Sequence, residues 1–342
     1  MFLPYLHQVA DRRDLSADQA YEAMLIILNG EATSAQIAAF LMALRMKGET
    51  ADELLGFARA MREKSQRVEV EGPLLDTCGT GGDGGGTFNV STIAAFVAAG
   101  AGARVAKHGN RSISSQCGSA DLLEALGINA ALTPSRISDC IRVHGIGFML
   151  APLMHPAMKH AHSARVELKL RTAFNLLGPL TNPAGASRQL IGAPSERAAE
   201  LMAHALAGLK MERAFVAHGS DGMDEITTTG PTIVFEIRGR DVRRNTWTPD
   251  DFGVSQARAQ DLAGGDLNTN REIACAVLRG GNGAHREIVL VNAAAALMAA
   301  GMAPGPRDGM RLAAQSIDSG AAWAKVEALR SFSTAEARCS AT

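Results

Sequence analysis

The sequence predicts an α/β protein, with a small helical domain at its N-terminus and a larger domain built on a central, largely parallel sheet. Three observations predict it. Residues up to about 70 carry only helical patterns, short apolar strands alternate with helices from Pro73 onward, and 342 residues suffice for about two domains. We therefore divide the chain into a helical domain, residues 1–70, and an α/β domain, residues 71–342. Helices from about 165–185 are candidates for joining the helical domain.

The helical domain is predicted from its start and stop signals. Three segments open with a capping box, in which a hydroxyl side chain precedes Gln or Glu by three positions. The pairs are Ser16 with Gln19, Thr33 with Gln36, and Thr50 with Glu53. Gly30 and Gly48 follow the first two helices, where glycine commonly ends a helix. We expect this unit to pack and to self-associate rather than to carry chemistry.

The larger domain is predicted from alternating strands and helices, which favour a parallel sheet with helical crossovers. The expected strands are 74–78, 104–107, 146–150, 189–191 and 214–217, with helices from residue 91, at 121–126 and at 195–210. Residues 232–237 and 241–247 suggest a β-hairpin. From residue 270 the chain is rich in alanine and helical in pattern.

Composition excludes several classes of function. Lys plus Arg number 34 and Asp plus Glu 35, so no net charge attracts the chain to nucleic acid or to an anionic membrane. Its apolar stretch at 93–103 is too short to cross a bilayer, and its start lacks the pattern of a secretory signal. Five scattered cysteines without zinc spacing indicate a reducing compartment. We expect a cytoplasmic protein with neither a nucleic-acid nor a membrane partner. The cysteines are Cys78, Cys117, Cys140, Cys275 and Cys339.

A glycine-rich segment, residues 79–92 (the glycine loop), lies between a predicted strand and a predicted helix. Backbone N–H groups and the helix dipole favour a phosphate at such a place. A flexible turn is the alternative. Gly79, Gly81 and Gly84 match the spacing of a dinucleotide site, but no acidic residue follows about 20 positions later. Asp83, within the loop, suits a ligand that carries hydroxyl groups or magnesium. The loop therefore predicts phosphate binding.

A second polar segment, residues 107–115 (the lysine loop, KHGNRSISS), follows the next strand. Ligands of α/β sheets bind beyond the carboxyl ends of the strands, where both loops would lie. Together they could hold more than one phosphate group. A solvated loop is the alternative, with Ser119 or Asp121 capping the following helix.

Two later segments carry further charges. Arg165 lies in a basic stretch, 155–183, and arginine is the natural partner of a planar carboxylate. The histidines of that stretch lack the spacing of zinc ligands and are expected to be solvated or hydrogen-bonded. Asp224 and Glu225 (the acidic pair) follow a predicted strand. Adjacent carboxylates suit magnesium, although this sequence is also common in surface turns.

Five segments occur in an order that resembles the anthranilate phosphoribosyltransferase family over nearly the whole chain. They are GTGGDGGGTFNVST, KHGNRSISSQCGSAD, RTAFNLLGPLTNP, GMDEITTTGPT and VLVNAAAAL. The resemblance implies a fold like that of nucleoside phosphorylases, commonly as a homodimer through the helical part. It also implies transfer of phosphoribosyl from 5-phosphoribosyl 1-pyrophosphate (PRPP) to anthranilate, giving N-(5-phosphoribosyl)anthranilate and pyrophosphate, in tryptophan biosynthesis. Related pyrimidine nucleoside phosphorylases have a different lysine loop.

The resemblance also implies roles for individual residues. It assigns catalysis to Lys107 and Asp83, and Mg2+ binding to Ser91, Asp224 and Glu225. The residues implied for anthranilate are Gly79, His108, Asn110, Arg165 and Pro179. Those implied for PRPP are Gly79, Gly82, Asp83, Thr87, Asn89, Val90, Ser91, Thr92, Lys107, His108, Gly109, Asn110, Arg111, Ser112, Ile113, Ser114, Ser115 and Ser119.

One stretch departs from the family pattern. Ser163 and Lys169 stand where the family commonly has proline and glycine, on either side of the retained Arg165. This departure affects the expected shape of the anthranilate pocket and leaves the donor residues unchanged.

The residue types suit this chemistry. Departure of pyrophosphate leaves positive charge on the ribose, so stabilising the leaving group by Mg2+, Lys107 and backbone N–H groups is the main task. The aromatic amine is neutral at pH 7 and needs no strong base. Two alternatives stay open: a dinucleotide-dependent oxidoreductase and a non-catalytic nucleotide- or nucleic-acid-binding relative. The missing acid after the second strand, the acidic pair and the near-neutral charge disfavour them.

Overall fold

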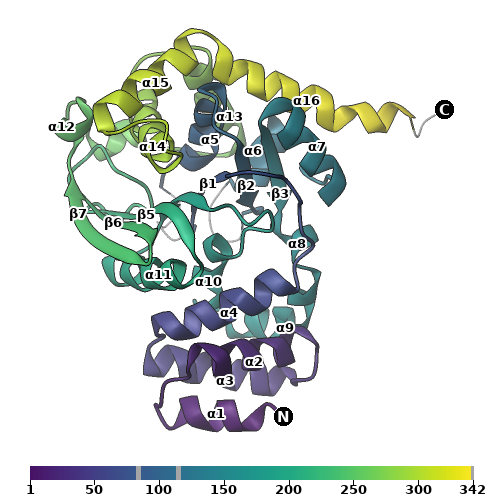
Figure 1. Ribbon diagram of the computed structural model, residues 1–342. Helices are drawn as coiled ribbons and strands as arrows, with labels where there is room; N and C mark the ends of the chain where they lie inside the picture. Colours follow the sequence, from purple (N-terminus) through teal and green to yellow (C-terminus); the bar gives the residue numbers. More distant parts are fainter. Residues whose placement is uncertain (82–85, 113–116, 340–342) are drawn as a thin grey trace.

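The computed structural model describes residues 1–81, 86–112 and 117–339, with side chains through residue 335. Figure 1 shows the N-terminal helices stacked at one end of the molecule and the sheet with its covering helices at the other. The predicted fold class, a small helical domain followed by a larger α/β domain, is confirmed.

The helical end begins with α1 (Leu3–Ala10), α2 (Ala17–Leu28), α3 (Ser34–Lys47) and α4 (Ala51–Glu63). All three predicted capping boxes are present, at the starts of α2, α3 and α4. Gly30 and Gly48 follow α2 and α3 with φ of +77° and +88°, a conformation that side chains other than glycine's rarely adopt. Later in the chain, α9 (Lys159–Leu168) packs against α2 and α3, and α10 (Phe174–Leu177) packs against α4.

A single seven-stranded sheet lies at the centre of the larger domain, in the order β3-β2-β1-β4-β5-β6-β7. The first five strands in this order are parallel, whereas β6 and β7 form an antiparallel hairpin on β5. Each predicted strand is present. Their bounds are β1 (Leu75–Gly79), β2 (Val105–Gly109), β3 (Ile146–Leu150), β4 (Arg188–Gly192), β5 (Met211–Gly219), β6 (Thr232–Gly239) and β7 (Asp241–Trp247).

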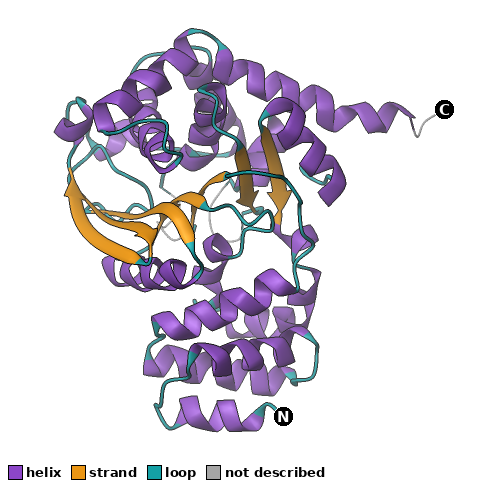
Figure 2. Ribbon diagram, viewed as in Figure 1, coloured by secondary structure: helices purple, strands orange, loops and turns teal. Residues whose placement is uncertain are grey.

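Both faces of the sheet are covered, as Figure 2 shows with the strands in orange between layers of helices. Neighbouring strand residues point to opposite faces. Leu190 and Phe215 join the core beneath α5 (Val90–Gly100) and α14 (Ala284–Ala299), whereas Ile191 and Val216 join the core shared with α11 (Glu196–Gly208) and the helical end. Because the parallel strands are covered on both faces, we expect a ligand to bind beyond their carboxyl ends.

Shorter or peripheral elements complete the chain. Within the described residues, no helix is both long and apolar enough to cross a membrane. Cys78, Cys117, Cys140 and Cys275 are free thiols.

The remaining elements are α6 (Ser119–Ala125), α7 (Pro134–His144), α8 (Ala151–Met154), η1 (Pro156–Met158), η2 (Gly178–Leu180), α12 (Pro249–Phe252), η3 (Ala259–Leu262), α13 (Leu267–Leu278), α15 (Pro306–Asp318) and α16 (Ala321–Cys339).

The close packing of α2 on α4 yields a prediction about stability. A Cβ at Gly56 would lie 2.2 Å from the Ala17 carbonyl oxygen and 2.7 Å from the Ala20 Cβ. Gly56→Ala should therefore lower the free energy of unfolding by about 1–3 kcal/mol, the usual cost of overpacking, despite alanine's higher helix propensity. Urea unfolding measures the effect. Gly305→Ala, whose Cβ meets nothing within 4 Å, is the control. Equal losses in the two variants would contradict the prediction.

Candidate functional site

The candidate site lies where the carboxyl ends of the parallel strands meet. Gly79 at the end of β1 is paired with Gly192 at the end of β4, and Gly109 ends β2. The glycine loop leaves β1 there, the lysine loop leaves β2, and the segment with the acidic pair follows β5. Three segments that are far apart in sequence therefore begin at one edge of the sheet.

The acidic pair contacts the glycine loop directly. The Asp224 Oδ2 atom accepts hydrogen bonds from the Gly81 N–H at 2.8 Å and from the Thr80 hydroxyl at 3.2 Å. The Glu225 Oε1 atom accepts from the Ser91 N–H at 3.1 Å, in the first turn of α5. Both carboxylates are buried. The acidic pair and Ser91, predicted together as magnesium ligands, therefore lie together.

Two glycines make this contact possible. A Cβ at Gly79 would lie 2.7 Å from the Asp224 Oδ2 atom, and a Cβ at Gly192 would lie 1.4 Å from the Asp224 backbone oxygen. Neither position has room for a side chain while Asp224 occupies its place. The requirement at Gly192 was absent from the sequence analysis, since nothing local marks a glycine that ends a strand as functional.

The end of the glycine loop is tied to its surroundings by polar side chains. The Asn89 amide donates to the Cys117 carbonyl at 3.0 Å, and the Thr92 hydroxyl bonds the Ser119 hydroxyl at 3.2 Å. Val90 begins α5 and is fully buried. Thr87 forms an antiparallel bridge with Ala263. The first part of α5 is thus joined to the segment that follows the lysine loop.

Lys107 and Gly109 are fixed within β2. The Lys107 ammonium is buried and donates to the Thr77 carbonyl. Burial lowers the pKa of Lys107, while the nearby Asp76 carboxylate acts in the opposite direction. A Cβ at Gly109 would lie 2.8 Å from the Phe148 ring, so the chain leaves β2 close to β3.

Asp121 organises the rest of the described lysine loop. Its Oδ2 atom accepts from the N–H groups of Ser112 and Gly118, each at 2.9 Å, and its carboxylate lies 3.3 Å from the Arg111 guanidinium. The Asn110 carbonyl accepts from the N–H of residue 120 at 3.1 Å. Of the two capping candidates, Asp121 supplies the side-chain acceptor at the start of α6, and Ser119 is the first helical residue.

His108 lies beside a second buried histidine, His155. Their ring centroids are 5.1 Å apart, and the His108 Nδ1 atom lies 3.2 Å from the Gly178 carbonyl oxygen. Burial lowers the pKa of His108 to about 3 and that of His155 to about 4, so both rings are neutral at pH 7. Each Nε2 atom is buried and has no hydrogen-bond partner in the described structure. His155 is hydrogen-bonded to the backbone of Met61 and Thr181, in line with the expectation for the histidines of this stretch. Its nearness to His108 was not predicted, because that depends on the fold.

Arg165 lies in α9, on the helical side of the molecule. It is half-buried, its guanidinium lies 5.0 Å from the centroid of the Phe174 ring, and burial lowers its pKa. No acidic side chain forms an ion pair with it in the described part of the chain. Pro179 is buried, and its carbonyl accepts from the Gln189 amide at 3.0 Å.

The two departures from the family pattern have visible consequences. The Ser163 hydroxyl bonds the Ser34 hydroxyl at 2.8 Å, so it ties α9 to the start of α3. Lys169 ends α9 with φ +48°, in the left-handed region that favours glycine. A lysine therefore takes up a glycine-type conformation close to Arg165.

Five of the predicted site residues lie outside the described part of the structure. They are Gly82, Asp83, Ile113, Ser114 and Ser115.

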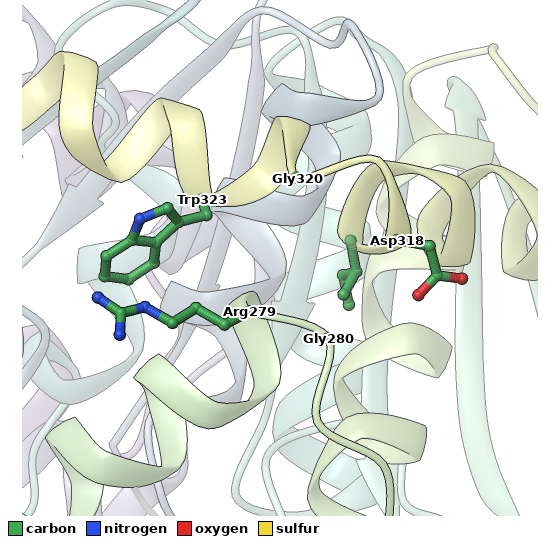
Figure 3. Close-up of a pocket in the computed structure, with 6 residues that line it drawn as sticks. Arg279, Gly280, Asp318, Gly320 and Trp323 are labelled. Carbon is green, nitrogen blue, oxygen red and sulfur yellow. The ribbon is translucent and has the colours of Figure 1, made fainter.

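A surface pocket of about 350 Å³ lies away from these loops, at the end of α13 and between α15 and α16 (Figure 3). The Arg279 guanidinium lies 4.2 Å from the centroid of the Trp323 ring, and Asp318 pairs with Arg286 at 2.6 Å. Gly100 lies at the end of α5 that is far from the glycine loop. It packs against the start of α16, where a Cβ at Gly100 would lie 2.6 Å from the Ala322 backbone nitrogen. The pocket is thus at the opposite end of α5 from the candidate site.

Comparison with protein families gives two adjacent matches. Residues 3–65 match the helical bundle domain of the glycosyl transferase family, and residues 71–323 match the α/β domain of the same family.

Individual relatives agree with these matches. An anthranilate phosphoribosyltransferase of Solibacter usitatus is 64% identical over 96% of this chain and 98% of its own length. The crystal structure of the Thermus thermophilus enzyme has a TM-score of 0.92 at 40% identity and covers 97% of this chain and 99% of that chain. The Saccharomyces cerevisiae enzyme in complex with PRPP and Mg has a TM-score of 0.90 at 28% identity, covering 97% and 98%. That yeast enzyme has also been solved with 4-fluoroanthranilate.

The contact between Gly79 and Asp224 yields a prediction about anion binding. Gly79→Ala should displace the Asp224 carboxylate, because the new Cβ would lie 2.7 Å from its Oδ2 atom. We expect about tenfold weaker binding of inorganic pyrophosphate with magnesium, since a hydrogen bond to a charged group is worth ~1.5–3 kcal/mol. Calorimetric titration measures this. Gly305→Ala, at the start of α15 and outside the substrate loops, is the control, because its Cβ would meet nothing within 4 Å. Parental affinity in Gly79→Ala, or tight NAD binding by the parent, would argue against the predicted phosphate site.

Proposed function

This chain belongs to the anthranilate phosphoribosyltransferase family, and we propose that its glycine loop, lysine loop and acidic pair together bind the donor of the family's reaction. The enzyme transfers phosphoribosyl from PRPP to anthranilate, giving N-(5-phosphoribosyl)anthranilate and pyrophosphate, in tryptophan biosynthesis. The observation that carries the proposal is the contact of Asp224 and Glu225 with the glycine loop and the first turn of α5.

The donor site is proposed at the edge of the sheet where these loops meet. Gly79, Thr87, and residues 89–92 would line one side, and the described residues 107–112 with Ser119 the other. Support comes from the hydrogen bonds that join Asn89 to Cys117 and Thr92 to Ser119. We extend the site to Gly82, Asp83 and residues 113–115 on the family resemblance alone.

Magnesium binding is proposed at the acidic pair with Ser91. The donor set is suitable, since two carboxylates and a hydroxyl are hard oxygen ligands that leave positions for water and phosphate oxygens. Both carboxylates are buried at the glycine loop, which would bring a bound cation next to the donor. When bound, Mg2+ would neutralise negative charge on the pyrophosphate group. The yeast relative's structure with PRPP and Mg supports this use of the metal.

Anthranilate is proposed to bind between Arg165 of α9 and the ends of β1 and β2, with Gly79, His108, Asn110 and Pro179. A guanidinium can hold a planar carboxylate through two hydrogen bonds, and no acidic side chain in the described chain competes for Arg165. The unpaired Nε2 atom of His108 supplies a further polar group. The yeast relative's complex with 4-fluoroanthranilate supports a site for the acceptor.

The chain's own residues would act mainly by positioning and by electrostatics. Lys107, which we assign together with Asp83 to catalysis, would hold the leaving pyrophosphate with its ammonium group. The aromatic amine attacks in its neutral form, so no strong base is required. With its pKa lowered to about 3, His108 stays neutral and serves as a hydrogen-bonding group rather than as an imidazolium acid. Ordering both substrates would supply the rest of the acceleration.

The organisation of the whole protein is also a proposal. We assign residues 1–70, joined by helices from about 165–185, to one domain and residues 71–342 to the catalytic domain. The packing of α9 on α2 and α3 supports this assignment. A homodimer formed through the helical domain, a cytoplasmic location, and the absence of nucleic-acid and membrane partners complete the proposal.

The decisive experiment follows anthranilate fluorescence during turnover. We expect consumption of anthranilate only when PRPP and magnesium are both present. Consumption without PRPP, or none with both, would contradict the proposed function.

The proposed metal site yields a prediction about magnesium dependence. Replacing Asp224 and Glu225 together by Ala should raise the magnesium concentration needed for half-maximal rate and lower kcat, because both carboxylate ligands are lost. Magnesium titration of the rate measures the effect, and circular dichroism checks that the fold is intact. A double variant with parental magnesium dependence would remove the acidic pair from the metal site.

Arg165 yields a prediction about the affinity for anthranilate. Arg165→Ala should raise the Kd for anthranilate about 10- to 150-fold, since a hydrogen bond to a charged group is worth ~1.5–3 kcal/mol and ~1.4 kcal/mol is tenfold. The affinity for PRPP should stay near the parental value, and Arg165→Lys should restore only part of the loss. Aniline, which lacks the carboxylate, should be a poor acceptor that is indifferent to the substitution. Equal losses for anthranilate and PRPP would show that Arg165 does not hold the carboxylate.

A further inference from the structure

The sheet is divided between β1 and β2. These neighbouring strands share one residue pair, Leu75 with Val105, where the Leu75 N–H donates to the Arg104 carbonyl at 2.9 Å. By contrast, β1 pairs with β4 through its final residue, and β2 does the same with β3. The ends of β1 and β2 therefore separate beneath the point where the glycine and lysine loops begin.

Side chains replace the hydrogen bonds of the missing ladder. Two residues beyond Leu75, a continued parallel ladder would join the Thr77 N–H to the Ala106 carbonyl and the His108 N–H to the Thr77 carbonyl. Instead, the His108 N–H donates to the Asp76 Oδ1 atom at 3.1 Å, and the Thr77 N–H also bonds the Asp76 carboxylate. The Asn182 amide donates to the Ala106 carbonyl at 2.8 Å. The Lys107 ammonium donates a hydrogen bond to the Thr77 carbonyl.

These three side chains form one buried polar network. The Asn182 amide also donates to the Asp76 Oδ2 atom at 2.7 Å. Asp76 is fully buried, and Asn182 and Lys107 are nearly so. Burial raises the pKa of Asp76, and the neighbouring Lys107 acts in the opposite direction. A buried carboxylate is costly unless its oxygens are satisfied, and this one is bonded at both oxygens.

The network contacts Lys107 and His108, the two residues of β2 that the proposed function assigns to the substrate sites. An ammonium has three N–H donors, and Lys107 gives one to Thr77, which leaves two without an acceptor in the described chain. His108 is held through its backbone N–H by Asp76. Closing the gap into a regular ladder would require these contacts to break and would shift Lys107 and His108 together.

We propose that Asp76 is a positioning residue for phosphoribosyl transfer, which together with Asn182 holds the ends of β1 and β2 apart and fixes Lys107 and His108 between the substrate loops. This inference rests on the proposed function of Lys107 in the donor site. Asp76 acts through Lys107 and His108 and need not touch either substrate.

The chain offers a matched control for a buried carboxylate. Glu53 is likewise fully buried, accepts from the Leu15 and Thr50 N–H groups at 3.0 and 2.9 Å, and lies 3.1 Å from the Lys47 ammonium. It belongs to α4, on the helical side of the molecule. Asp76→Asn and Glu53→Gln make the same chemical change at equal burial, but only the first affects β2.

The first test compares kcat and thermal unfolding in these two variants. We expect both to lower the unfolding temperature. Asp76→Asn should also lower kcat about 10- to 100-fold, because misplacing a group by about 1 Å can cost 100-fold. Glu53→Gln should keep the parental kcat. Equal kcat in the two variants at matched stability would overturn the inference.

A double-mutant cycle separates positioning from a general loss. Lys107→Met should lower kcat, and adding Asp76→Asn to it should lower kcat by less than Asp76→Asn does alone, because coupled residues are not additive and only the part that acts through His108 remains. A full additional loss in the Lys107→Met background would show that Asp76 does not act through Lys107. If Lys107→Met alone kept the parental kcat, the donor-site assignment itself would be wrong, and the inference would fall with it.

A third variant covers the case in which Asp76→Asn does not fold. The exchange Asp76→Asn with Asn182→Asp keeps one carboxylate and one amide in the gap. We expect it to fold and to recover part of kcat. Recovered stability with no recovery of kcat, measured beside Glu53→Gln, would show that restoring the carboxylate and amide between β1 and β2 does not restore the positions that kcat depends on, and would overturn the inference.

Discussion

The approach of Asp224 to the ends of β1 and β4 is the contact on which the candidate site depends. It requires hydrogen at Cα of Gly79 and Gly192, since a Cβ at Gly192 would lie 1.4 Å from the Asp224 backbone oxygen. With Asp224 in place, its carboxylate bonds Gly81 in the glycine loop, and Glu225 bonds Ser91 at the start of α5. A segment that follows β5 thereby determines how the loop after β1 lies. Because Gly79 and Gly192 have no side chain, three distant parts of the chain can meet in one site.

On the side of β1 that faces β2, away from the Asp224 contact, the sheet opens into a gap. On its β4 side, β1 is paired through Gly79 and packs closely, whereas on its β2 side the ladder ends after Leu75. A parallel sheet buried on both faces has little tolerance for unpaired backbone groups. The polar side chains of Asp76, Asn182 and Lys107 satisfy those groups, so the strands can separate without leaving them unbonded. The gap brings charge into an otherwise apolar core at the edge where phosphate is expected to bind.

Local patterns predicted the fold well because its signals are local. The capping boxes at Ser16, Thr33 and Thr50 depend on residues three apart, and each starts a helix in the structure. The glycine loop and acidic pair were likewise identified as segments. Their mutual contact was not predictable by pattern, because Asp224 and Gly81 are 143 residues apart. Asp76 and His155 were missed for the same reason, since a buried aspartate in a strand and a histidine after a strand become notable only beside Lys107 and His108.

The residues proposed for the acceptor are held in place by different contacts from those proposed for the donor. The residues proposed for the donor lie at the edge of the sheet, whereas Arg165 lies on α9, which packs with the helical end. Its guanidinium rests on the Phe174 ring, and cation–π contact of this kind orients the group without neutralising it. Lys169, with φ +48°, ends the helix one turn later in a conformation that costs a lysine about 1–3 kcal/mol and a glycine much less. The bond from Ser163 to Ser34 ties the same helix to the start of α3. The position of Arg165 is therefore set by the helical end rather than by the sheet, so the proposed acceptor pocket could diverge from the family pattern while the loops proposed for the donor kept theirs.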